Sequence, residues 1–346
     1  MSPPRPKPKS PSEPAGRPET LGGWLAWAET RYAEEGLALG QVAADAHDEA
    51  LYLLLSTLGL PLDSDEGVLE RTLTRSEQAA VEKALGRRIL ERVPAAYLTG
   101  EAWLGGHKFR VDPRVIIPRS YFVEIIPRLG PVRGRIADVC TGSGCLAVLL
   151  ALRYPEADVD AIELSKDALE VARANVRDHG LSKRVHLHQS DVFDAVPLAR
   201  YGLIVSNPPY EPTAIVDGLP EEFQREPRMA LDGGADGLDV IRKLLDQAAH
   251  RLESGGRVLI EVGGLREAVD REFSELKPRW LRTADGTDCV CLIEGFRLAR
   301  GSGRKGRSLP EGLERPGTAS SSRPAAARGG RSGSTSAGKS PRSRRS

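Results

Sequence analysis

The sequence predicts an α/β fold in which a small helical domain precedes a seven-stranded sheet. Between residues 135 and 293, short runs rich in Val, Ile and Leu alternate with helical patterns. Such alternation is typical of a parallel sheet covered by helices on both faces. Residues 20–92 show only helical periodicity. A length of 346 residues leaves room for both units, since a domain usually takes about 100–200 residues.

The helical domain is expected over residues 20–93. Its first helix is indicated by apolar residues at spacings of three and four, namely Leu21, Trp24, Leu25, Ala28 and Tyr32. A second helix is expected from Asp45 to Leu58, where Gly59 follows. Thr74 and Glu77 form a capping-box pattern that begins a third helix, which runs to about Val93.

A β-hairpin is expected to link the two units over residues 94–118. The runs 97–103 and 107–111 read as short strands on either side of Gly105-Gly106.

The sheet itself is predicted from seven strands and three helices. The strands are expected at 136–140, 159–163, 185–188, 203–206, 258–261, near Trp280, and at 289–293, and the helices at 146–154, 167–180 and 239–252. Ligands of such sheets bind at the carboxyl ends of the strands, so functional residues are sought there.

A glycine loop follows the first strand of this sheet. Gly142 and Gly144 begin a Gly-x-Gly-x-x-Ala pattern between a strand and a helix, which suits close approach of a ligand to the backbone. Glu163 ends the second strand 21 residues later, where an acid can accept hydrogen bonds from ribose hydroxyls. Asp191, after the third strand, is placed to bond an adenine amino group. The pattern predicts a nucleoside-containing cofactor, either a dinucleotide or S-adenosylmethionine, and it lacks the P-loop motif for ATP or GTP.

The fourth strand ends in Asn207-Pro208-Pro209-Tyr210. Prolines fix φ and remove backbone donors, so this turn is expected to be rigid. It would hold the Asn207 side chain and the Pro208 carbonyl as two acceptors for an NH2 group on an sp2 carbon, and Tyr210 would stack on the flat group. Because an amide nitrogen is a poor nucleophile, catalysis by such a turn rests on positioning and on polarisation of the transition state.

Composition and charge exclude several classes of protein. No apolar run has the length of a membrane span, and the proline-rich start has no signal-peptide core. Four cysteines without C-x-x-C spacing indicate reduced thiols and no metal site, so a cytoplasmic location is expected. The formal charge of +1 divides unevenly: residues 301–346 carry eleven Lys or Arg and two Glu, whereas residues 20–300 sum to −10.

Both ends of the chain are expected to be disordered, over residues 1–19 and 298–346. The first contains seven prolines, and the second is rich in Arg, Ser, Gly and Ala without periodicity. The basic end is expected either to attach weakly to ribosomes or RNA, or to remain a solvated tail without a partner.

Taken together, these motifs resemble the HemK/PrmB family of S-adenosylmethionine-dependent protein-glutamine methyltransferases. The resemblance covers about residues 20–296 and rests on the motifs at 93–103, 117–120, 138–145, 207–210 and 225–239. It implies a Rossmann-like class I methyltransferase domain over 119–297 and a substrate-recognition role for 20–93. The motifs at 97–103, 118–120 and 138–145 are closest to the branch that methylates large-subunit ribosomal protein three.

The resemblance also implies roles for individual residues. The cofactor would be S-adenosylmethionine, held by Asp138, Cys140, Thr141, Gly142, Ser143, Gly144, Glu163, Asp191, Val192 and Asn207. The glutamine amide would be bound by Asn207, Pro208, Pro209 and Tyr210, with Arg119 at the entrance of the pocket. Asn207, Pro208 and Tyr210 are the expected catalytic residues.

Four other functions remain open at this point. The first is methylation of the Gly-Gly-Gln motif of peptide-chain release factors, by the second branch of the same family. The second is methylation of adenine N6 in nucleic acid, which presents an equivalent NH2 group but would be disfavoured by the acidic body. A non-catalytic ribosome-binding module is the third. A dehydrogenase is the fourth, and it would leave the Asn-Pro-Pro-Tyr motif unexplained.

Overall fold

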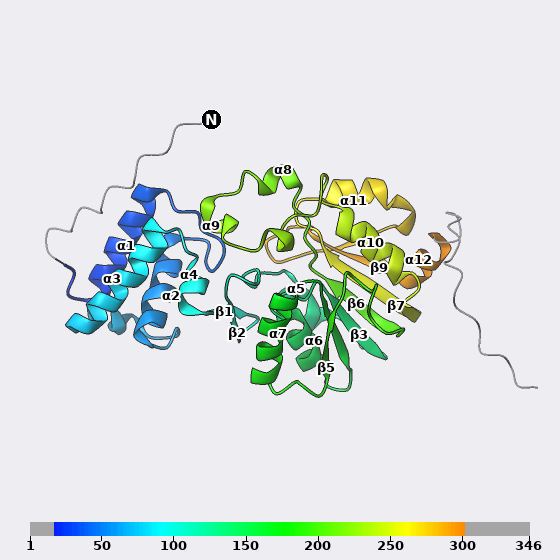
Figure 1. Ribbon diagram of the computed structural model, residues 1–346, viewed down its shortest axis with the longest axis horizontal. Coiled ribbons are helices and arrows are strands. Elements are labelled where there is room, and N and C mark those ends of the chain that lie inside the picture. Colours follow the sequence, from blue (N-terminus) through cyan, green and yellow to red (C-terminus); the bar gives the residue numbers. More distant parts are fainter. Residues whose placement is uncertain (1–16, 302–346) are drawn as a thin grey trace, which may run out of the picture. The chain divides into compact units, whose positions relative to one another are not determined.

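The computed structural model describes residues 17–301 (Figure 1). All of them belong to one compact unit. The predictions for residues 1–16 and 302–346 lie outside the described residues.

The helical segment contains three long helices, as predicted. They are α1 (Leu21–Glu35), α2 (Ala46–Leu58) and α3 (Arg75–Leu90), with a 3-10 turn, η1 (Glu66–Glu70), between the last two. Side chains of Thr20, Asp45 and Thr74 cap the three N-termini, and the predicted capping box between Thr74 and Glu77 is present. The apolar faces of the three helices meet in a core of their own.

The hairpin is shorter than predicted. Residues 97–99 were expected to begin a strand, but they belong to a short helix, α4 (Ala95–Thr99), which ends at Gly100 with φ 74°. The buried Ala95 and Ala96 and the hydrogen bond from the Tyr97 hydroxyl to the Val115 carbonyl (2.6 Å) hold this turn. The hairpin therefore consists of β1 (Glu101–Leu104) and β2 (His107–Arg110) only.

The sheet has seven strands, which confirms the predicted fold class. In chain order they are β3 (Arg135–Val139), β4 (Val159–Glu163), β5 (Val185–Gln189), β6 (Tyr201–Ser206), β7 (Leu252–Glu261), β8 (Arg279–Leu281) and β9 (Val290–Glu294). Their order in the sheet is β5-β4-β3-β6-β7-β9-β8. Strand β9 is antiparallel to both of its neighbours, and the strands β5, β4, β3, β6 and β7 are parallel.

Helices cover both faces of the sheet (Figure 1). Neighbouring residues of one strand contribute to opposite faces: Ile136 packs with α6 (Cys145–Arg153), whereas Ala137 packs with α10 (Asp239–Ala248). The remaining helices of the sheet region are α5 (Phe122–Ile125), α7 (Lys166–Asp178), α8 (Thr213–Val216), α9 (Glu221–Gln224), α11 (Arg266–Glu272) and α12 (Gly295–Gly301), with 3-10 turns η2 (Ile126–Arg128), η3 (Arg228–Ala230) and η4 (Ser274–Leu276).

Two predicted boundaries need correction. The helix expected over 239–252 ends at Ala248. The strand expected from residue 258 begins at Leu252, because Tyr201 pairs with Leu252 before an irregular step in the register. Ordered structure also continues past residue 297, since α12 reaches Gly301 and Leu298 is buried in the core. Within residues 17–301, no helix has the length and apolar character needed to span a membrane.

A buried carboxylate connects four strands of the sheet. Asp160 in β4 accepts hydrogen bonds from Arg135 (2.6 and 3.1 Å), from the His188 ring (3.0 Å) and from the Tyr201 hydroxyl (2.9 Å). Burial alone would raise the pKa of Asp160, but these hydrogen bonds outweigh burial and lower the pKa below its usual value. The carboxylate is therefore ionised in the folded protein at neutral pH.

We expect the substitution Asp160→Asn to destabilise the fold by about 3 kcal/mol at pH 7, because Arg135, His188 and the buried Tyr201 hydroxyl lose their ionised acceptor. The folded-state pKa lies below the unfolded value of about 3.9, so the carboxylate stabilises the fold above that pH and loses its effect as the pH falls. Urea unfolding at pH 7 and pH 3 measures both effects. Asp158→Asn serves as the control: its carboxylate is half exposed and lies 3.7 Å from the same Arg135, so its loss should cost under about 1 kcal/mol. A difference between the wild type and Asp160→Asn that grows toward pH 3 would contradict this assignment.

Candidate active site

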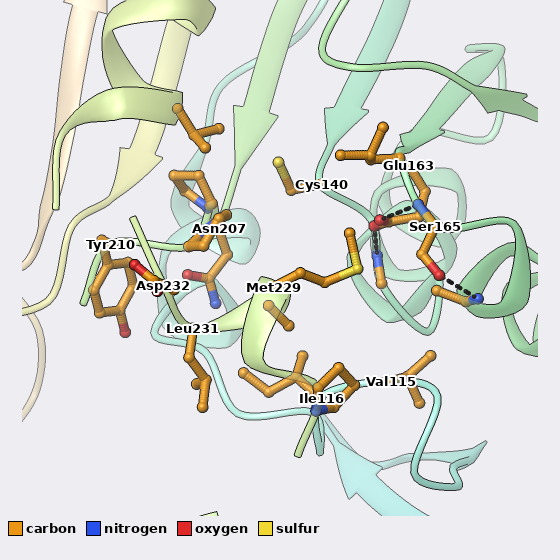
Figure 2. Close-up of a pocket in the computed structure, with 18 of the residues that line it drawn as sticks. Val115, Ile116, Cys140, Glu163, Ser165, Asn207, Tyr210, Met229, Leu231 and Asp232 are labelled. Atoms are coloured by element: carbon orange, nitrogen blue, oxygen red, sulfur yellow. Dashed lines mark hydrogen bonds between the residues drawn. The ribbon is translucent and has the colours of Figure 1, made fainter. Parts of the chain in front are cut away.

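A cavity of about 430 Å³ lies at the carboxyl ends of four neighbouring strands, β5, β4, β3 and β6. Ten of the predicted site residues line it: Arg119, Cys140, Gly142, Glu163, Asp191, Val192, Asn207, Pro208, Pro209 and Tyr210. They come from five separate parts of the chain, and Figure 2 shows several of them around the same space. The structure thus brings the two predicted motifs into one site.

Four predicted residues do not line the cavity, namely Asp138, Thr141, Ser143 and Gly144. All four are buried: Asp138 lies in β3, and the other three belong to the glycine loop. Asp138 accepts a hydrogen bond from the Thr141 hydroxyl (2.5 Å), and the Ser143 carbonyl accepts one from the Asn175 amide (2.8 Å). Burial raises the pKa of Asp138 to about 7. These hydrogen bonds stabilise the conformation of the glycine loop.

The glycine loop has a left-handed backbone at three positions. Cys140, Gly142 and Gly144 have φ angles of 62°, 56° and 79°. A Cβ on Gly144 would lie 3.1 Å from the Cβ of Ala172 in α7, so a side chain there would be tightly packed as well as strained by the positive φ. Val192, at the opposite side of the cavity, also has a positive φ of 54°. A β-branched residue rarely adopts this conformation, and such strain is concentrated at functional sites.

Glu163 is fixed by the backbone on both sides. One carboxylate oxygen accepts a hydrogen bond from the Gly142 amide (2.9 Å) and the other from the Ser165 amide (3.0 Å). Each oxygen keeps a further lone pair. Burial raises the pKa of this carboxyl group. An acid held in this way can accept hydrogen bonds from two adjacent hydroxyl groups in the cavity.

Asp191 lies at the exposed rim, where its carboxylate pairs with Lys243 (2.7 Å). Its neighbour Val192 is buried and lines the cavity. The predicted partner of an adenine amino group is thus already engaged with a lysine, whereas Val192 offers an apolar wall.

Asn207 carries the most informative atom of the site. It directly follows β6, whose last residue, Ser206, is anchored by a hydrogen bond from its hydroxyl to the Val139 carbonyl (2.7 Å). Within the described part of the chain, the Oδ1 atom of Asn207 is buried and has no hydrogen-bond partner. Figure 2 shows this carboxamide pointing into the cavity, between Tyr210 and Met229 in this view. A buried acceptor without a donor costs about 1–3 kcal/mol, so the atom is suited to a ligand that supplies an N–H group.

Two glycines set the position of Tyr210. A Cβ on Gly263 would lie 2.5 Å from the Tyr210 ring, and a Cβ on Gly237 would lie 2.2 Å from its carbonyl oxygen. Burial raises the pKa of the phenol, which therefore stays protonated at neutral pH. Tyr210 is a fixed, neutral wall of the cavity.

Arg119, predicted at the pocket entrance, is paired within the protein. Its guanidinium donates two hydrogen bonds to the buried carboxylate of Glu226 (2.6 and 2.7 Å), and the same carboxylate accepts from the Ile117 amide (3.2 Å). Ser120 is held similarly, through its hydroxyl, by the buried Glu261 (2.5 Å). Arg119 lines the cavity, but its charge is neutralised within the protein.

One wall of the cavity contains no residue that the sequence analysis assigned to the site. This wall comes from the segment between β6 and α10 and includes Leu219, Phe223, Met229 and Leu231. Its signal in the sequence was a set of apolar residues in a stretch without strand or helix periodicity. The motif over 225–239 includes Met229 and Leu231, but no local pattern indicates that Glu226 pairs with Arg119.

The cavity offers hydrogen-bond acceptors on two sides, and the Glu163 carboxylate among them fits the ribose hydroxyls of S-adenosylmethionine. A carboxylate suited to ribose hydroxyls lies on one side, and the unpaired Asn207 oxygen lies on the other. Among the described residues, no group of three or more His, Cys, Asp or Glu side chains is arranged to hold a metal ion.

Comparison with known proteins gives the family. The profile of the methyltransferase small domain matches residues 120–236. A ribosomal protein uL3 glutamine methyltransferase of Bordetella pertussis is 45% identical over 287 residues, which cover 81% of this chain and 96% of the relative. The chain belongs to the ribosomal protein uL3 glutamine methyltransferase family. This confirms the predicted family and branch.

Further members of the uL3 glutamine methyltransferase family show similar agreement. The enzyme of Burkholderia pseudomallei is 42% identical and that of Neisseria gonorrhoeae 43%, each over 81% of this chain and at least 95% of the relative. A solved methyltransferase from Pyrococcus furiosus is 19% identical with a TM-score of 0.40, covering 64% of this chain and 96% of the other.

Proposed function

We propose that this protein transfers a methyl group from S-adenosylmethionine to the side-chain amide nitrogen of a glutamine in ribosomal protein uL3. The observation that carries this proposal is the buried Asn207 Oδ1 atom, which lacks a donor and faces the cavity. Membership in the family supplies the substrate, since the relatives are named for uL3.

In this proposal, Asn207 and the Pro208 carbonyl accept the two amide hydrogens of the substrate glutamine. Binding both hydrogens fixes the plane of the amide and directs its nitrogen toward the cofactor side of the cavity. The Tyr210 ring covers one face of the amide. When bound, S-adenosylmethionine supplies a methyl group on a sulfonium that reacts without a metal. One amide proton leaves to solvent, so the product is a neutral N-methyl amide.

Glu163 would hold the ribose of the cofactor, and Val192 would pack against its adenine. Cys140 and Gly142 border the space where the methionine part would lie. The helical domain over 20–93 is assigned to recognition of the protein substrate. A cytoplasmic site of action is part of the same proposal, because the substrate is a ribosomal protein.

Methyl transfer from isotopically labelled S-adenosylmethionine tests the proposal. The purified protein is offered unmethylated uL3, an unmethylated release factor and unmethylated DNA in separate reactions. Label on a glutamine of uL3 alone is the expected result. Label on the release factor would keep the chemistry and replace the substrate, and label on DNA would replace both.

The basic C-terminal segment is assigned to weak attachment to ribosomes or RNA, on the basis of its eleven Lys and Arg residues against two Glu. Deletion of residues 302–346 should leave methylation of free uL3 within about twofold of the full chain, while salt-dependent binding to ribosomes weakens. Co-sedimentation with ribosomes at several salt concentrations measures the binding. Loss of methylation of free uL3 on truncation would instead place the segment in the site.

A further inference from the structure

Glu222 is a buried acid in the segment between β6 and α10, which forms one wall of the cavity. It directly precedes Phe223, a residue that lines the cavity. It lies in α9 and is 2% exposed. Its Oε1 atom accepts hydrogen bonds from Arg92 (3.0 Å) and from the Ala38 amide (3.2 Å), and Arg88 lies 3.7 Å away. All three partners belong to the helical segment, more than 120 residues earlier in the chain.

Further hydrogen bonds join the helical segment to the segment that contains α9. The side-chain amide of Gln41 donates to the Glu222 carbonyl (3.3 Å), and Arg225 donates to the Glu91 carbonyl (2.6 Å). Arg92 has a positive φ of 57° and also donates to the Glu35 carbonyl (2.7 Å). A non-glycine residue keeps such a backbone only where its surroundings hold it there.

The charges of this junction are buried together. Arg88 is fully buried and pairs with Glu49 (2.6 Å) as well as lying near Glu222. Although burial raises the pKa of Glu222, hydrogen bonds and the nearby arginines outweigh it and lower that pKa. Removing one member of a buried ionic group leaves the others uncompensated and is strongly destabilising to the contact.

The junction continues directly into the cavity. Phe223 and Leu219 line the cavity on either side of Glu222. The Phe223 ring lies 5.5 Å from the Arg119 guanidinium, which Glu226 binds from the same segment. A shift of α9 would therefore displace Phe223 and Leu219 within the cavity that Asn207 also lines.

We propose that Glu222 is a positioning residue, which ties the wall over residues 219–226 to the helical segment and so keeps the amide-binding half of the cavity in its productive shape. The expected change in kcat rests on the proposed function, whereas the expected displacement of the wall does not. We expect binding of the cofactor to depend little on this wall, since Cys140, Glu163 and Val192 follow or end β3, β4 and β5.

The test compares Glu222→Gln with Glu221→Gln. Glu221 lies in the same helix and is exposed, and Gln at this position can still accept the hydrogen bond from Arg225, so it is a matched control. For Glu222→Gln we expect kcat with uL3 to fall by about 10- to 100-fold, because a displacement of about 1 Å costs that much. The Kd for S-adenosylmethionine should stay within about twofold of the wild type.

The two comparison variants should behave differently from Glu222→Gln. Glu221→Gln should match the wild type in both kcat and Kd. Glu222→Asp, which keeps the charge, should recover part of the lost kcat.

Hydrogen exchange provides a readout that needs no substrate. In Glu222→Gln, amides over residues 213–231 should exchange faster, while those of β3 to β6 exchange as in the wild type. Assays are run well below the midpoint of thermal unfolding of the least stable variant.

Two outcomes would overturn the proposal. One is unchanged hydrogen exchange together with unchanged kcat, and the other is a loss of kcat matched by an equal loss of cofactor affinity. If the wild type does not methylate uL3, the proposed function fails, and the exchange data still decide the role of Glu222.

Discussion

Replacement of Asn207 by Ala should lower kcat by about 10²- to 10³-fold, which is the usual effect of removing one preorganised polar contact from the transition state. The Oδ1 atom of Asn207 has no other partner in the described structure, so its loss should cost the fold little. We expect the Kd for S-adenosylmethionine to change far less than kcat. Steady-state kinetics with uL3 and calorimetric titration of the cofactor measure the two quantities. Equal losses in both would contradict the assigned role.

The chain offers a matched contrast, because Asn175 is its only other asparagine. The Asn175 side chain is buried and has three partners: the Arg110 amide (2.7 Å), the Arg110 carbonyl (3.0 Å) and the Ser143 carbonyl (2.8 Å). The substitution Asn175→Ala should therefore affect stability more than the chemical step. It should lower the free energy of unfolding by about 1–3 kcal/mol and weaken cofactor binding through the glycine loop. If both variants lost stability equally, the distinction between a catalytic and a structural amide would fail.

The second large effect is expected at Glu163. The substitution Glu163→Gln should weaken S-adenosylmethionine binding by roughly 10- to 100-fold, since hydrogen bonds to a charged group are worth about 1.5–3 kcal/mol each. The variant also turns an NH2 group toward the amide of Gly142 or of Ser165, both of which are donors. Titration of the cofactor measures the affinity, and Glu156→Gln, at an exposed turn, is the control.

At saturating cofactor, Glu163→Gln should recover most of its kcat, because the carboxylate acts on binding and not on the amide. A variant that binds the cofactor normally but turns over slowly would assign Glu163 to the chemical step instead.

Much of the site could be predicted because it lies at the ends of strands. Periodicity places Glu163 and Asn207 at strand ends, and parallel strands bring their carboxyl ends to one edge. The same reasoning could not find Glu226 or Glu222, whose partners lie 107 and 130 residues away in the sequence. An ion pair across that distance leaves no local pattern. The helix over 95–99 was missed for a related reason, since its stability depends on burial of Ala95 and Ala96 and not on its own short sequence.

The order of the last strands also lay beyond local patterns. Periodicity identifies β8 and β9 as strands, but it does not show that β9 lies between β7 and β8. That arrangement depends on which edges remain free once the other strands have paired.

This arrangement has a consequence for biosynthesis. Among the described strands, β8 pairs only with β9, and β9 is the last to leave the ribosome. Until Val290–Glu294 has been made, β8 has no partner and the long β7 presents an unpaired edge along Arg257–Glu261, the stretch that β9 later covers. Exposed edges of this kind promote pairing between chains. A premature stop before residue 290 should therefore yield an aggregation-prone product even though every residue of the cavity wall has already been translated.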